Sequence, residues 1–217
     1  MKLFQKVLSK RLYPALVKYM ESFPAQFKFI PENRKRDLER VADFISTRIE
    51  NEVPARIIFI CTHNSRRSHM GQIWAAVAAY YYGKLNVETY SGGTEATAFN
   101  PKAVEAMRQA GFKISSLGTG KNPVYSVQFA EDYQAIKVFS KKFDDSVNPT
   151  KDFCAVVTCS DADKNCPYIP GAILRVPITY EDPKLFDHTE KESEAYRERC
   201  LQIGAEMFYL FGHVKKE

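Results

Sequence analysis

Residues 56–68, RIIFICTHNSRRS, decide the fold and point to the chemistry. Ile57–Ile60 is a continuous apolar run, which is typical of a strand buried on both faces of a parallel sheet. A polar loop follows from Cys61 to Arg67, and Ser68–Tyr82 then predicts a core-facing helix that ends at Gly83. This order of strand, loop and helix is the repeating unit of α/β proteins.

The same alternation continues along the chain. We expect further strands at 87–90, 155–158 and 173–178, and helices at 101–110, with Gly111 as its C′ residue, and at 189–211. The sequence therefore predicts an α/β fold in which helices flank a central, mostly parallel sheet. Residues 121–145 differ, because two runs at 124–129 and 134–139 flank a short polar turn and predict an inserted β-hairpin.

The first 52 residues read as a separate helical region. Apolar residues from Leu3 to Met20 recur at helical spacing, Phe23-Pro24 interrupts this pattern, and a second helix begins near Pro31 and ends before Pro54. We therefore predict an N-terminal extension of two helices at 1–52, followed by one α/β domain at 53–217. The apolar faces of the extension need a partner, so it could cap the sheet, form a homodimer surface or contact a reductant.

Composition excludes several classes of protein. With 45% hydrophobic residues, 10 Gly and 11 Pro in 217 residues, the chain is neither disordered nor collagen-like. It has no apolar run of about 18 residues, and Lys6, Lys10 and Arg11 interrupt any signal-peptide core, so we expect a cytoplasmic protein without membrane contact. The net charge of +5 is small for a nucleic-acid binder, so we expect none. Five cysteines are too few for a secreted disulfide scaffold, which favours a catalytic, redox or metal-binding use.

The segment Cys61–Ser68 is a C-x5-R-S loop, and its residue types suit an oxyanion. Backbone N–H groups in such a loop form an anion nest at the helix N-terminus, and the planar guanidinium of Arg67 would clamp a tetrahedral anion. The same positive field favours the thiolate of Cys61, to which Ser68 is placed to donate a hydrogen bond. We therefore predict Cys61 as the nucleophile. The predicted anion-binding residues are Thr62, His63, Asn64, Ser65, Arg66, Arg67 and Ser68.

Two other kinds of site do not match this loop. A Walker loop needs a glycine-rich G-x4-G-K run, which is absent. A zinc site that pairs Cys61 with His63 lacks a C-x2-C partner, so no metal is predicted.

The loop resembles that of the low-molecular-weight protein tyrosine phosphatase superfamily, and within it the thioredoxin-coupled arsenate reductases. Three further segments carry the resemblance: 91–95 with 100–104, the C-x6-C-P segment at 156–167, and Glu181-Asp182-Pro183. The resemblance covers about residues 55–211 apart from the predicted hairpin, and the C-x6-C-P segment is its most discriminating part.

The resemblance implies reduction of arsenate to arsenite without a bound cofactor. Cys61 would be the nucleophile and Asp182 the general acid, with Asp187 or Glu181 as alternatives for the acid. If the reaction leaves Cys61 bonded to the departing group, a second thiolate, Cys159, must attack Cys61. Cys166 would then complete a Cys159–Cys166 disulfide that an external dithiol of the thioredoxin type reduces. Cys154 and Cys200 are predicted to be packing residues.

Two other functions remain open. A phosphatase acting on phosphotyrosine or small phosphate esters would use the same loop and acid through a Cys61 phosphoenzyme, without the relay. A catalytically idle anion-binding regulator would use its N-terminal helices to meet a partner.

Three positions depart from the family pattern. His63 stands where glycine is common, and Arg66 stands where a further cysteine is common. Gln72 occupies the position of a glutamate that binds potassium in some reductases, so the resemblance does not carry that ion over to this chain.

Overall fold

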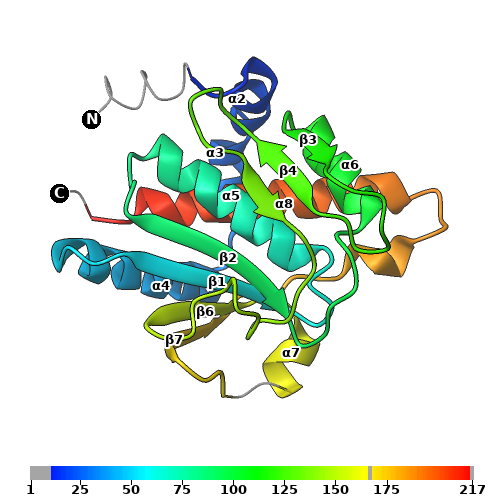
Figure 1. Cartoon of the computed structure of the whole chain (residues 1–217). Coiled ribbons are helices and arrows are strands. Elements are labelled where there is room, and N and C mark those ends of the chain that lie inside the picture. The colour runs from blue at the N-terminus through cyan, green and yellow to red at the C-terminus, as the bar shows by residue number, and fades with distance from the viewer. Residues whose placement is uncertain (1–10, 166–167, 216–217) are drawn as a thin grey trace.

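A four-stranded parallel sheet forms the centre of the computed structural model, which describes residues 11–165 and 168–215 (Figure 1). The strand order is β2-β1-β6-β7, and every neighbouring pair is parallel. The strands are β1 Ala55–Cys61, β2 Val87–Gly93, β6 Phe153–Val157 and β7 Ala172–Pro177. The predicted α/β fold with a mostly parallel sheet is therefore confirmed.

α5 Arg67–Tyr81 connects β1 to β2 and α7 Ser160–Asn165 connects β6 to β7, as expected for parallel neighbours. α6 Pro101–Gln109 follows β2, and α8 Glu192–Gly212 follows β7 after the short 3-10 helix η2 at Pro183–Phe186. Gly111 has a φ of 108° just after α6, a left-handed conformation that suits the predicted C′ glycine.

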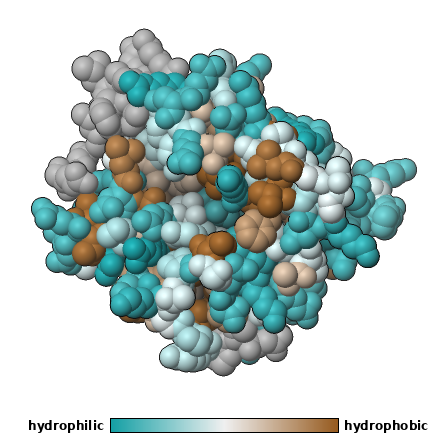
Figure 2. Space-filling model, viewed as in Figure 1, coloured by the Kyte–Doolittle hydropathy of each residue, from teal (hydrophilic) through white to brown (hydrophobic). Residues whose placement is uncertain are grey.

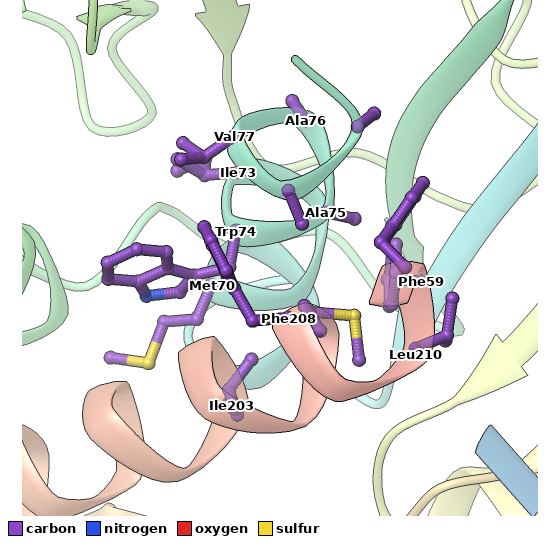
Figure 3. Packing of buried hydrophobic residues seen from close by; sticks show 14 of the residues in the cluster. Phe59, Met70, Ile73, Trp74, Ala75, Ala76, Val77, Ile203, Phe208 and Leu210 are labelled. Carbon is purple, nitrogen blue, oxygen red and sulfur yellow. The ribbon is translucent and has the colours of Figure 1, made fainter. Parts of the chain in front are cut away.

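The two faces of β1 enter different cores, because successive side chains of a strand point to opposite faces. Ile57 and Phe59 join the large cluster that includes α5 and α8, whereas Ile58 and Ile60 join a smaller cluster that includes Ala162 of α7. Between α5 and α8, large apolar side chains pack around Trp74 and Phe208 (Figure 3). The rigid sheet and α5 thus fix both ends of the loop at Cys61–Arg67.

The described part of the N-terminal extension packs into the same core. It contains α2 Pro14–Met20, α3 Phe23–Gln26, the 3-10 helix η1 at Phe27–Phe29 and α4 Glu32–Glu50. The second predicted helix is confirmed as α4, whose buried residues contact α8, β1 and β7. The partner surface of α4 is therefore the chain itself, and the homodimer stays a prediction.

The prediction for the first helix was partly wrong. Leu12 pairs with Ala130 in an isolated β-bridge, so the predicted helical run does not pass through Leu12, and α2 begins at Pro14. The predicted interruption around Phe23-Pro24 is confirmed, because α2 ends at Met20 and a new helix, α3, begins at Phe23. Pro24 lies in the first turn of α3, where its missing N–H is not needed. The predicted apolar positions before Lys10 lie outside the described residues.

The inserted hairpin is part of a larger unit. β4 Tyr125–Gln128 and β5 Ile136–Val138 pair antiparallel as predicted, but β3 Lys113–Ser116 adds a third strand, antiparallel to β4. Three of the four β3 residues are exposed, so this strand has no apolar pattern that could have predicted it.

Apolar residues form separate patches among hydrophilic ones on the face that Figure 2 shows. Within the described residues, no helix is long and apolar enough to cross a membrane.

Candidate active site

The C-x5-R-S loop runs from the last residue of β1, Cys61, to the first residue of α5, Arg67. Asn64 has a φ of 44°, a left-handed conformation that asparagine adopts more readily than most residues. Its side chain is buried, with Oδ1 accepting from the Lys141 amide at 2.9 Å and Nδ2 donating to Ser68 Oγ at 2.9 Å. Asn64 therefore fixes the middle of the loop.

Ser68 lies beside the predicted nucleophile. Cys61 Sγ is 3.1 Å from Ser68 Oγ, and Cys61 is 3% exposed. Because Ser68 Oγ already accepts a hydrogen bond from Asn64, its own hydrogen is free to point at the sulfur. This arrangement can stabilise a thiolate at Cys61.

Arg67 lies between the loop and the segment that follows β7. Its Nη1 donates to the Tyr180 carbonyl at 2.8 Å, and its Nη2 donates to Asp182 Oδ2 at 2.6 Å. Its Nε is buried and has no hydrogen-bond partner in the described part of the chain. A buried donor without an acceptor is unfavourable, and an oxyanion in the loop could satisfy it.

Among the three candidate acids, the structure brings only Asp182 to Arg67. Asp182 also caps η2 by accepting from the Lys184 amide. Asp187 instead accepts from Tyr196 Oη at 2.9 Å and lies 4.0 Å from Arg66. Glu181 is exposed and pairs with Arg199 at 3.4 Å.

Cys159 is brought close to the loop, because β6 lies next to β1 in the sheet. Its buried Sγ is 3.4 Å from Oγ1 of Thr62, the residue after Cys61, and accepts from the Ala162 amide at 3.4 Å. Cys166, the other predicted member of the relay, lies outside the described residues.

The remaining loop residues hold the loop to its surroundings. Ser65 Oγ donates to the Ala98 carbonyl at 2.7 Å, and Arg66 Nε donates to Tyr196 Oη at 2.9 Å. The His63 side chain is 43% exposed, and its Nε2 lies 3.7 Å from Glu95, while its carbonyl accepts from Ser140 Oγ. The His63 imidazole thus faces Glu95.

Sequence reasoning missed the segment Ser140–Lys141, which binds the loop from outside. Ser140 Oγ donates to the His63 carbonyl at 2.9 Å, and the Lys141 carbonyl accepts from the Gly93 amide. Lys141 is almost fully buried, and burial lowers its pKa to about 8. These contacts join residues about eighty positions apart in the chain, and no sequence pattern encodes them.

Cys154 and Cys200 lie in the core. Both are fully buried, and burial raises the pKa of the Cys154 thiol well above its ordinary value and that of Cys200 to about 11. Such thiols are poor nucleophiles, which agrees with packing roles.

Gln72 does not reproduce a carboxylate site. Its Nε2 donates to the Thr89 carbonyl at 3.1 Å, and its buried Oε1 has no partner among the described residues. A neutral amide supplies one oxygen but not the charge of a glutamate. No group of three or more His, Cys, Asp or Glu in 11–165 and 168–215 could hold a metal ion.

No family model matches this chain, but curated proteins named arsenate reductase are similar to it in sequence. The chain is 34% identical to arsenate reductase 2 of Staphylococcus epidermidis over 131 residues, which cover 58% of the chain and 77% of that protein. It is 31% identical to the arsenate reductase of Bacillus subtilis over 151 residues, 70% of the chain and 88% of that protein.

Solved structures overlap the chain at lower identity. A low-molecular-weight protein tyrosine phosphatase from T. tengcongensis has a TM-score of 0.49 at 17% identity, covering 73% of the chain and 98% of its own. The identity and coverage of the curated relatives show the family: the chain belongs to the arsenate reductase family.

Proposed function

We propose that this protein reduces arsenate to arsenite, with Cys61 as nucleophile and a two-cysteine relay through Cys159 and Cys166. The observation that carries the proposal is the position of the Cys159 thiol, 3.4 Å from the Thr62 hydroxyl in the Cys61 loop. A phosphatase needs the loop and the acid, but it has no use for a second thiol next to the loop.

The first step would form a covalent adduct. The Cys61 thiolate attacks arsenic(V), and one arsenate oxygen leaves as water after Asp182 protonates it. Arg67 holds the remaining oxygens through its unpartnered Nε and an Nη.

The second step would transfer the electrons. The Cys159 thiolate attacks the Cys61 sulfur, so that a Cys61–Cys159 disulfide forms and the sulfur–arsenic bond breaks. The electron pair of that bond stays on arsenic, which leaves as arsenite. Cys166 then attacks Cys159, which frees Cys61 and leaves a Cys159–Cys166 disulfide for an external dithiol of the thioredoxin type.

A single-turnover reaction of the fully reduced protein with arsenate, followed by disulfide mapping, tests this sequence. We expect one arsenite per protein and a Cys159–Cys166 disulfide. Cys61→Ser should release no arsenite, and Cys166→Ser should stop at a Cys61–Cys159 disulfide. Cys154→Ala is the matched control, since Cys154 is buried away from the loop, and it should react like the wild type.

The phosphatase is the alternative that this experiment separates. Unchanged thiols and no arsenite after exposure to arsenate, together with steady hydrolysis of an aryl phosphate, would refute the reductase and support a Cys61 phosphoenzyme. Hydrolysis alone decides nothing, because the two reactions share their first step.

A further inference from the structure

Arg34, in the first turn of α4, reaches the segment that carries Asp182. Its Nη2 donates to the Thr179 carbonyl, and its guanidinium lies over the Tyr180 ring at 5.2 Å from the centroid. Its Nε is 3.9 Å from Glu206 Oε2 on α8. The N-terminal extension thus contributes a cation directly behind the candidate site.

Tyr180 connects this cation to the anion clamp. Its hydroxyl donates to Glu206 Oε2 at 2.8 Å, on the side of Arg34, while its carbonyl accepts from Arg67 Nη1 at 2.8 Å. Asp182 follows two residues later and holds the other terminal nitrogen of Arg67. A shift of Tyr180 would therefore move both partners of Arg67.

The hydrogen-bonded side chains around Glu206 are buried, so replacing any one of them is energetically unfavourable. Glu206 is 2% exposed and also accepts from Gln202 Nε2 at 3.1 Å. Burial raises the pKa of Glu206, while the nearby Arg34 cation opposes that rise. Loss of Arg34 would remove one of the two arginine cations, Arg34 and Arg199, that act on the buried Glu206 carboxyl, and it would leave the Thr179 carbonyl without the Arg34 donor. Both changes favour rearrangement of the segment.

We propose that Arg34 is a positioning residue, through which the N-terminal extension holds the segment 179–182 so that Asp182 and Tyr180 meet Arg67. This inference rests on the proposed role of Asp182 as the general acid. In this inference the N-terminal extension positions the general acid, in addition to packing in the hydrophobic core.

The test is a double-mutant cycle read in single-turnover arsenite release, with the rate constant and the half-saturating arsenate concentration measured separately. The variants are Arg34→Gln, Arg34→Lys, Asp182→Asn and the double variant Arg34→Gln/Asp182→Asn. Arg36→Gln is the matched control, because Arg36 lies in the same turn of α4 and is exposed. Thermal unfolding of each variant selects a temperature at which all are folded.

We expect Arg34→Gln to lower the rate constant about tenfold, since small displacements of a catalytic group have effects of that order or larger. Arg34→Lys keeps a cation and one donor, so its rate should lie between those of Arg34→Gln and the wild type. Arg36→Gln should match the wild type. Because Arg34 acts through Asp182, the double variant should be no slower than Asp182→Asn alone.

Other outcomes overturn the inference. Rate losses that multiply in the double variant would show that Arg34 acts independently of Asp182, as a structural residue would. An Arg34→Gln rate equal to that of Arg36→Gln would show that the contacts do not position the acid.

Failure of the proposed function gives a different pattern. In that case the wild type releases no arsenite, and the same cycle is measured on aryl phosphate hydrolysis, where the loop and acid are shared. A wild-type rate in Asp182→Asn would instead remove Asp182 from its role, and the inference with it. A wild type that turns over neither substrate refutes both proposals.

Discussion

His69 gives a sharp prediction about stability and pH. It follows Ser68 on α5 and is fully buried, with Nδ1 3.1 Å from Ser91 Oγ and its ring 4.4 Å from the Phe99 ring. Its Nε2 has no hydrogen-bond partner among the described residues. Burial, with a smaller contribution from the Lys141 cation, lowers the pKa of His69 to about 3.

The sign and size of the effect follow from proton binding. The unfolded chain binds a proton at this histidine near pH 6.5, whereas the folded chain does so only near pH 3. Between these values the unfolded state binds more protons, so the free energy of unfolding falls as the pH falls. The slope is about 1.4 kcal/mol per pH unit, which amounts to about 3 kcal/mol between pH 7 and pH 4.5.

The measurement is urea unfolding of the wild type and His69→Gln from pH 7.5 to pH 4.5. Other groups titrate equally in both proteins, so the difference between their unfolding free energies isolates His69. We expect that difference to shift by about 3 kcal/mol, with the wild type losing more stability in acid.

A difference between wild type and His69→Gln that does not change with pH would refute the reasoning. It would mean that the folded protein accepts a proton at His69 near the ordinary pKa, and hence that water or an acceptor reaches Nε2.

Two further predictions concern packing and the loop. Gly204→Ala places a methyl group 2.7 Å from the Phe23 ring and 3.0 Å from the Trp74 ring, so calorimetry should show a loss of about 1–3 kcal/mol in the free energy of unfolding. Gly118→Ala, with nothing within 4 Å of the added methyl group, should change that free energy by less than about 0.5 kcal/mol. Asn64→Ala removes the hydrogen bond to Ser68 and the tendency of asparagine to adopt the left-handed conformation at position 64. We expect the alkylation rate of the Cys61 thiol at neutral pH to fall at least about tenfold. An unchanged rate would contradict the role of Asn64 in shaping the loop.

The sequence predicted the fold correctly where a short segment contains both a hydrophobic pattern and residues of a recognisable chemical type. The apolar run at Ile57–Ile60 predicted β1, and the residue types from Cys61 to Ser68 predicted an anion loop at the start of a helix. The strand β3 was missed because three of its four residues are exposed, and the bridge at Leu12 was missed because its partner lies far along the chain.

The sequence by itself determined the parallel α/β sheet, the position of the C-x5-R-S loop and the types of residue that could act there, because these depend on spacings within a few residues. Only the tertiary structure decided which acid meets the arginine and what holds that acid. Arg67 and Asp182 are 115 positions apart, and Arg34 and Thr179 are 145 positions apart. Contacts of this kind arise from the order of strands in the sheet and from how α4 and α8 pack against it, and neither leaves a periodic signal in the residues that finally touch.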